Sequence, residues 1–254
     1  MTMKKTRVKH WISVLIITIY LLNQSISVSA MNTGFNTEEV STETYSNVIS
    51  RIELKLLLDE PKKKPIVCFD VNGDKMIALG HSEHTAKTIT IYSDTGIFLY
   101  GYSFVYDGSI GLKWDRENII LFLARSDIAI LVDPQAQIKE IRKIVSSKEN
   151  NSYWNNDVWA ESRLVDNAEF IIRNDFGILN LFQNSYSQVV VLYPGEDETI
   201  IYDVGIKQLG DFFIFSLLIV LFFLICLMII AYYHIHRQGK GQGTVCVNPS
   251  KKLR

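Results

Sequence analysis

The chain has 254 residues, a formal net charge of −1 and 48% hydrophobic residues, so it can form one moderate domain and also carry strongly apolar segments. Its charge is uneven, because four basic and no acidic residues precede residue 31, and five basic and no acidic residues lie in the last 21. Once these nine are set aside, 17 of the 26 basic residues remain against all 27 acidic ones, a formal charge of −10 for the middle. An acidic middle repels phosphates, which excludes a nucleic-acid partner, and basic ends around an acidic middle predict a membrane topology.

Residues 1–30 have the pattern of a secretory signal peptide. A basic stretch is followed by an apolar stretch from Trp11 to Leu22 and by small residues that end at Ala30. Cleavage after Ala30 is expected, and an uncleaved signal anchor over 11–28 is the alternative. Both interpretations place the following residue outside the cytoplasm.

Residues 31–65 are expected to form an N-terminal lead and a connector. The first part is polar, and residues 48–58 fit the spacing of either a helix face or a strand. The Pro-Lys-Lys-Lys-Pro run at 61–65 then predicts a solvated break.

Residues 66–210 are predicted to be an extracytoplasmic β domain, since short β-branched and aromatic runs alternate with Gly, Asn and Asp. The dipeptide Asn72-Gly73 between two apolar runs predicts a hairpin with a type I′ turn. Three strand–turn–strand segments are visible, and the turn residues Asp94 and Asp133 of the first two lie 39 positions apart. The segments are 88–100, 127–144 and 188–204, with an insertion around 146–161 before the third.

A unit of about 40 residues that holds up to four short strands resembles the blade of a β-propeller. The resemblance covers residues 66–204 and rests on the motif of a strand, an Asp-containing turn and a strand. Three units fall short of the usual four to eight blades. The expected fold is therefore mainly β, with antiparallel blade-like sheets in a partial or open β-propeller-like array, or alternatively a β-sandwich. The arrangement of segments also resembles membrane-anchored bacterial envelope proteins.

Residues 211–233 are predicted to form a transmembrane helix. The 22 residues from 212 to 233 carry no formal charge and would span about 33 Å as a helix, enough to cross a bilayer core. The basic, acid-free tail at 234–254 is expected in the cytoplasm. No Asp, Glu, Lys, Arg or His lies within the 212–233 run, which favours an anchor over a transport role.

Catalytic and metal-binding patterns are weak throughout the chain. His81 and His84 have an HxxH spacing, but the segment 80–87 is expected to be a loop without a third ligand, so no metal site is predicted. Cys68 is expected to be a small buried hydrophobe, without a disulfide partner in the same compartment. There is no G-x-S-x-G motif and no glycine-rich phosphate loop after a strand, so neither an enzyme nor a cofactor is predicted.

The most distinctive segment, 150–159, concentrates aromatic rings among amides. Rings that stack and amides that hydrogen-bond are the groups that glycan and peptide sites use. The predicted ligand-binding residues are Tyr153, Trp154, Asn155 and Trp159. The alternative is that the two tryptophans fold back and fill a core.

Together these features predict a membrane-anchored, extracytoplasmic binding or sensing module that contacts a protein partner or a cell-envelope glycan. One alternative is a structural subunit of a membrane complex, completed by strand pairing with a partner. A second alternative is an envelope hydrolase whose catalytic carboxylates cannot be identified from the sequence.

Overall fold

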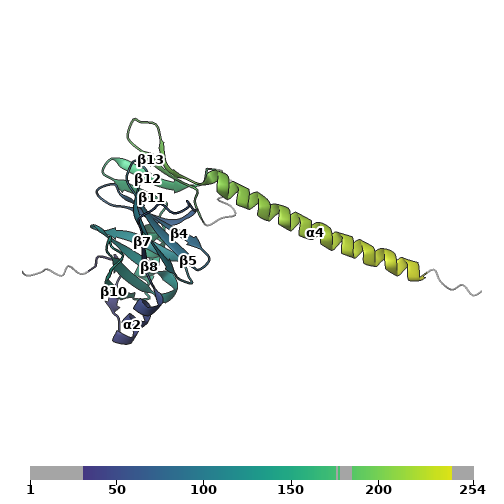
Figure 1. Ribbon diagram of the computed structural model, residues 1–254, viewed down its shortest axis with the longest axis horizontal. Coiled ribbons are helices and arrows are strands. Elements are labelled where there is room, and N and C mark those ends of the chain that lie inside the picture. The colour runs from purple at the N-terminus through teal and green to yellow at the C-terminus, as the bar shows by residue number, and fades with distance from the viewer. Residues whose placement is uncertain (1–30, 176, 178–184, 242–254) are drawn as a thin grey trace, which may run out of the picture. The chain divides into compact units, whose positions relative to one another are not determined.

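The computed structural model describes residues 31–175, 177 and 185–241. The predicted signal segment 1–30 and the end of the tail, 242–254, lie outside the described residues. The fold is mainly β, with three antiparallel sheets and one C-terminal apolar helix, and the described residues form no closed barrel or closed propeller (Figure 1).

Each sheet contains four strands that follow one another in the chain and pair with their neighbours. The first sheet holds β3 (Ile66–Val71), β4 (Ile77–Glu83), β5 (Ala86–Tyr92) and β6 (Phe98–Val105). The second holds β7 (Ile110–Asp115), β8 (Asn118–Leu123), β9 (Ile128–Val132) and β10 (Ile138–Ile144). The third holds β11 (Ser162–Val165), β12 (Ala168–Arg173), β13 (Gln188–Leu192) and β14 (Thr199–Asp203).

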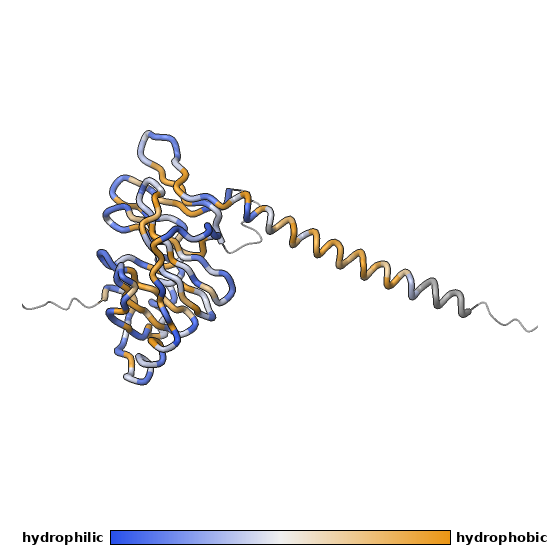
Figure 2. Tube along the Cα trace, viewed as in Figure 1, coloured by the Kyte–Doolittle hydropathy of each residue, from blue (hydrophilic) through white to orange (hydrophobic). Residues whose placement is uncertain are grey.

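The first sheet is covered on both faces at β3 and β4, which explains why β3 and the start of β4 are apolar without a clear alternation. On β4, Ala78 packs in the core shared with the second sheet, whereas Ile77 and Leu79 pack in the core shared with the third. A strand that is buried on both faces places apolar residues at every position. The hydropathy colouring shows the same arrangement, with hydrophobic strands and hydrophilic turns (Figure 2).

The hairpin predicted at Asn72-Gly73 is present, but the predicted type I′ turn is wrong. Lys75 N donates to Asn72 O at 3.0 Å, and Lys75 has the positive φ of 59°. Gly73 is not among the residues with positive φ. The connection between β3 and β4 is therefore the five-residue segment 72–76, and the side chain of Asn72 holds it by accepting a hydrogen bond from Met76 N at 2.8 Å.

The three predicted strand–turn–strand segments are hairpins between the third and fourth strands of each sheet: β5–β6, β9–β10 and β13–β14. In the second of them, Asp133 Oδ1 accepts from Gln135 N and Gln137 N at 3.0 and 2.8 Å, which explains the aspartate at this turn. The insertion that precedes the third sheet is helical. It contains α3 (Lys148–Tyr153) and a π-helical turn (Trp154–Val158).

Residues 33–58 contribute a helix and two strands to the domain. The helix α2 (Thr42–Arg51) is capped by Ser41, whose side chain accepts from Thr44 N, so residues 48–51 of the ambiguous segment are helical. The strand β1 (Thr37–Glu39) pairs with β10, and β2 (Lys55–Leu57) pairs with β6. These two strands cover the outer edges of the second and first sheets.

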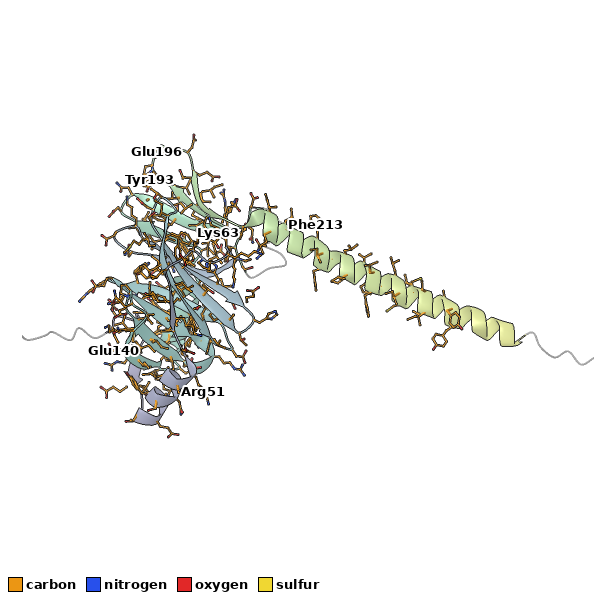
Figure 3. All side chains as sticks on the ribbon, in the orientation of Figure 1. Arg51, Lys63, Glu140, Tyr193, Glu196 and Phe213 are labelled. Carbon is orange, nitrogen blue, oxygen red and sulfur yellow. The ribbon has the colours of Figure 1, made fainter. Side chains whose placement is uncertain are left out.

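The C-terminal helix α4 (Gly205–Gly241) begins six residues earlier than predicted. Asp203 Oδ1 accepts a hydrogen bond from Gly205 N at 2.7 Å, which satisfies a backbone donor at the start of the helix. Residues Gly205–Tyr233 form the one described helix that is long and apolar enough to cross a membrane. Its hydrophobic side chains, Phe213 among them, are exposed along the helix (Figure 3). The hydropathy colouring marks most of the helix as hydrophobic (Figure 2).

Candidate functional site

The first strands of the three sheets meet at a single buried carboxylate. Asp70, on β3, is 8% exposed, and its Oδ2 accepts from Trp114 N of β7 at 2.8 Å. Its Oδ1 accepts from Arg163 Nε of β11 at 2.7 Å. The Asp70 side chain therefore bonds to a strand of each of the other two sheets.

Arg163 extends this junction to the helical insertion. Its guanidinium also donates to five carbonyl oxygens, among them those of Phe69 at 3.2 Å and Asp157 at 2.7 Å. A buried ion pair is tolerated where further hydrogen bonds satisfy both groups, and this condition is met here. The insertion is thus held to the point where the sheets meet.

A second set of contacts fixes the insertion at its beginning. Asn150 is buried, and its Nδ2 donates to Val145 O at 2.6 Å and to Asn36 O at 3.0 Å. Its Oδ1 accepts from Asn36 N at 2.9 Å. The insertion is therefore a docked segment with a defined conformation.

The four predicted ligand-binding residues take up different positions. Trp154 is 8% exposed and packs against Phe35 and Phe122, with ring centroids 4.9 and 5.7 Å apart. Trp159 stacks on Trp154 at 4.8 Å and keeps 37% of its surface exposed. One tryptophan therefore lies in the core and the other is accessible.

The other two predicted residues are the chain neighbours of Trp154, one before it and one after it. The hydroxyl of Tyr153 accepts from Lys113 Nζ at 2.8 Å, and its ring packs on Phe35. Asn155 is exposed, and its Nδ2 donates to Asn151 O at 3.1 Å within the helical segment. The structure thus brings Trp154 and Trp159 together and leaves Asn155 on the surface.

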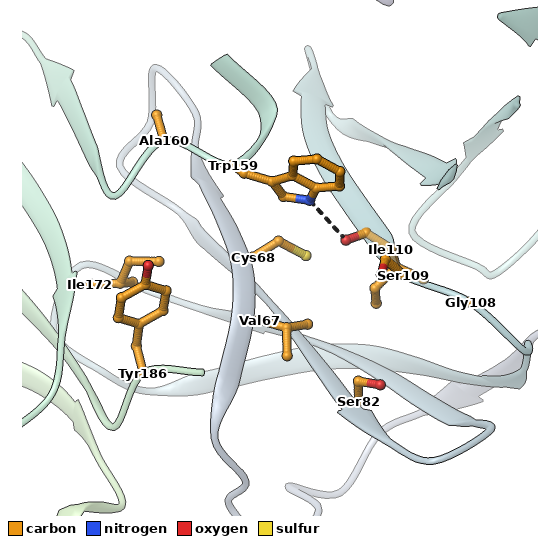
Figure 4. Close-up of a pocket in the computed structure, with 10 residues that line it drawn as sticks. All are labelled: Val67, Cys68, Ser82, Gly108, Ser109, Ile110, Trp159, Ala160, Ile172 and Tyr186. Carbon is orange, nitrogen blue, oxygen red and sulfur yellow. Dashed lines mark hydrogen bonds between the residues drawn. The ribbon is translucent and has the colours of Figure 1, made fainter. Parts of the chain in front are cut away.

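Trp159 lines a cavity of about 520 Å³ (Figure 4). The indole Nε1 donates to Ile110 O at 3.4 Å, which fixes the plane of the ring. The lining comes from all three sheets and the segments between their strands: Val67, Cys68, Ser82, Gly108, Ser109, Ile110, Trp159, Ala160, Ile172 and Tyr186. Sequence reasoning found only Trp159 of this set.

The lining of this cavity is neutral. Its polar side chains are the indole of Trp159 and the hydroxyls of Ser82, Ser109 and Tyr186, and Tyr186 donates to Glu161 Oε1 at 2.6 Å. Burial raises the pKa of the Cys68 thiol to about 12, so this group is not a nucleophile at neutral pH. An aromatic face with several hydroxyls suits a neutral polar ligand.

A smaller cavity of about 330 Å³ is lined by residues 153 and 156–158 of the insertion. It shares Ala160 with the first cavity. Its lining is charged, with Asp70, Arg163, Lys113 and Asp157 among the residues. Asp70 and the two bases are already bonded to protein partners, Lys113 to Tyr153 and Asp70 to Arg163. The insertion thus contributes to a neutral and a charged cavity.

His81 and His84 differ from the predicted loop. His81 lies within β4 and is buried, with Nδ1 3.0 Å from Pro65 O and Nε2 2.9 Å from Thr90 Oγ1. Only the two residues His84 and Thr85 separate β4 from β5. Among the described residues no group of three metal-ligating side chains occurs.

Comparisons of this chain with protein-family models, curated proteins and solved structures give no match. A functional proposal therefore depends on the geometry of the cavities, on the insertion and on the apolar helix.

Proposed function

We propose that this protein is a membrane-anchored, extracytoplasmic binding module that holds a neutral polar ligand with a flat apolar face in the cavity beside Trp159. The sugar ring of a cell-envelope glycan has this chemistry. The observation that carries the proposal is the accessible indole of Trp159 above a neutral cavity of about 520 Å³ that is lined with hydroxyls. Such rings stack on the apolar face of a ligand while neighbouring hydroxyls bond to its polar edge.

The rigidity of the site supports the same function. Trp159 is backed by Trp154, and the insertion that carries both is fixed by Asn150 at one end and by Arg163 at the other. A ring that is already ordered loses little conformational entropy when a ligand binds. The sheets serve in this proposal as an open, blade-like array that presents the insertion.

Glycan-array binding of the full-length protein in mild detergent tests this proposal. The substitution Trp159→Ala should weaken glycan binding at least about tenfold, because a central tryptophan commonly contributes most to such a contact. Tyr45→Ala is the matched control, since Tyr45 on α2 is 39% exposed, close to the 37% of Trp159. Absence of binding to any glycan, or equal binding by both variants, would contradict the proposal.

The proposed topology places the β domain outside and the tail in the cytoplasm, and the basic, acid-free tail supports it. A membrane-impermeant thiol reagent tests the orientation. In intact cells the reagent should label an Asp94→Cys variant, because Asp94 is exposed in a hairpin turn of the β domain. Cys246 in the tail should be labelled only after permeabilisation. Labelling of Cys246 in intact cells would reverse the orientation.

A structural subunit is the second candidate, and the outer edge of the third sheet favours it. The first and second sheets have β2 and β1 on their outer edges, whereas β14 has no fifth strand beside it among the described residues. An uncovered edge can accept a strand from a partner protein. Light scattering of the protein extracted in mild detergent should then show a complex with a second chain, and a strict monomer would remove this candidate.

A further inference from the structure

The hydroxyl of Ser82 on the wall of the Trp159 cavity has a fixed hydrogen-bonding direction. Ser82 lies near the end of β4 and lines the cavity (Figure 4). Lys87 Nζ, on the neighbouring strand β5, donates to Ser82 Oγ at 2.6 Å. An ammonium can only donate, so the Ser82 oxygen is the acceptor in this bond. Within the described part of the chain no acceptor takes the Ser82 proton, which leaves it available to a ligand.

Lys87 holds this direction in place. The residue is 3% exposed, and its Nζ also donates to His84 O at 2.7 Å, so the ammonium is fixed against the Ser82 side chain. Lys87 and Ser82 are direct partners in the register of β4 and β5. A hydrogen bond from an ammonium strengthens the next bond in the same chain, because each bond polarises its neighbour. The Ser82 hydroxyl is therefore a stronger donor than that of an ordinary serine.

Tyr186, which also lines the cavity, has the opposite constraint. Its Oη donates its proton to Glu161 Oε1 at 2.6 Å. Burial raises the pKa of Tyr186 to about 12, so the phenol keeps that proton at neutral pH. The Tyr186 oxygen can therefore only accept from a ligand. Because Trp159 Nε1 is already bonded to Ile110 O, the cavity has one directed donor, Ser82, and one directed acceptor, Tyr186.

The wall beside the Ser82 donor is apolar. Positions 80 and 82 lie on the same face of β4, because residues two apart in a strand share a face. Gly80 leaves space that the thiol of Cys68 occupies, with Sγ 2.4 Å from where a Cβ at position 80 would lie. Val67 and Cys68 both line the cavity (Figure 4). The Ser82 hydroxyl is thus set beside a surface that suits a methyl group.

We propose that the ligand of the Trp159 cavity is an N-acetylated sugar whose acetamido carbonyl accepts the Ser82 proton. This inference rests on the function proposed above and narrows its ligand class. An amide carbonyl only accepts, and it is a stronger acceptor than a sugar hydroxyl, so it matches the Ser82 donor. The acetamido methyl packs on the apolar wall, and a hydroxyl of the sugar donates to Tyr186. Ser82 is then the residue that selects an acetylated sugar over its hydroxyl analogue.

Calorimetric titration with triacetylchitotriose and cellotriose tests this inference, because the two trisaccharides differ only in carrying acetamido or hydroxyl groups at C2. The full-length protein is used in a detergent without a sugar headgroup. The wild type should bind triacetylchitotriose at least about tenfold more tightly than cellotriose, since one strong hydrogen bond is gained. Ser82→Ala should bring the two affinities within about threefold of each other, whereas Ser82→Thr keeps a hydroxyl and should retain the preference. Ser103→Ala is the matched control, because Ser103 lies on β6 of the same sheet and outside this lining.

The outcomes separate this inference from the function on which it rests. Cellotriose binding should be unchanged in Ser82→Ala, which shows that the variant is folded. If the wild type binds both trisaccharides equally and Trp159→Ala weakens both, the acetyl preference is overturned and the proposed function stands. Absence of triacetylchitotriose binding also overturns the inference, and the glycan array then decides the proposed function separately. A preference that persists in Ser82→Ala, or is lost equally in Ser103→Ala, would remove the role of Ser82.

Discussion

The two faces of the first sheet are buried in chemically different ways. The core toward the second sheet consists mostly of aliphatic side chains such as Ile89 and Leu112, together with the rings of Tyr102, Phe104 and Trp114. On the face toward the third sheet, the Tyr92 and Tyr202 rings lie 5.5 Å apart, and the ring of His81 stacks on Tyr202 at 5.8 Å. The interface with the second sheet is therefore mainly apolar, whereas the interface with the third sheet also contains a buried imidazole.

The two interfaces should respond differently to a change of pH. Apolar burial does not change with pH, but a buried histidine adds a proton-dependent term to stability. The third sheet, which follows the insertion with Trp159 and precedes α4, should therefore be the part whose packing responds to acid. The second sheet should stay packed under the same conditions.

The largest expected effect comes from removing the carboxylate that links both interfaces. Asp70→Ala leaves Arg163 and the Trp114 backbone N without their partner, and breaking a buried ion pair in this way costs about 3–5 kcal/mol. Asp70→Asn keeps an acceptor for Trp114 N and should cost less. Urea unfolding of the detergent-solubilised protein measures both, with Asp94→Ala in an exposed turn as the control. A loss for Asp70→Ala no larger than for the control would show that the junction does not hold the sheets together.

The next effect is the acid sensitivity of the interface with the third sheet. Burial lowers the pKa of His81 from 6.5 to about 4, and the nearby positive charge of Lys64 lowers it as well. Because the unfolded state binds the proton more readily, the stability that neutral His81 contributes is complete above pH 6.5. It falls as the pH drops toward about 4, by on the order of 3 kcal/mol in total.

Hydrogen exchange at pH 7 and pH 5 checks this prediction on both interfaces at once. Amides of β12 and β13 should lose protection at pH 5 more than amides of β8 and β9. His81→Leu removes the titrating group and should abolish the difference between the two pairs of strands. An equal loss of protection in all four strands of the wild type would assign the acid effect to other groups.

The sequence predicts the elements of this fold better than it predicts the cavities. The run Thr88–Tyr92 and the Asp turns identify hairpins because strand pairing and turn chemistry are local. The type of the Asn72-Gly73 turn was wrong because the positive φ falls on Lys75, a residue type that gives no such signal. Local sequence patterns predict the backbone conformation over a few residues and say little about contacts beyond them.

The residues that line the cavity could not be predicted, because contacts between distant parts of the chain bring them together. Ser82, Ser109 and Tyr186 have unrelated spacings, and only the packing of three sheets brings them to Trp159. The segment 150–159 was singled out by composition, but composition does not tell which tryptophan is buried. The π-helical turn between them decides this, since it turns Trp154 toward Phe122 and leaves Trp159 accessible.

The smallest expected effect compares one hydroxyl at each interface. Tyr202 Oη donates to Lys64 O at 2.7 Å and accepts from Lys64 N at 2.8 Å, whereas Tyr102 Oη bonds to one backbone group, donating to Asp133 O at 2.8 Å. Tyr202→Phe leaves two backbone groups of Lys64 unsatisfied, so it should cost about 1–3 kcal/mol, and Tyr102→Phe should cost about 1 kcal/mol. Urea unfolding measures the pair, with each variant serving as the control for the other. If Tyr102→Phe costs as much as Tyr202→Phe, then hydroxyl bonds contribute equally to the two interfaces, and the polar character of the third-sheet interface would have to come from His81 alone.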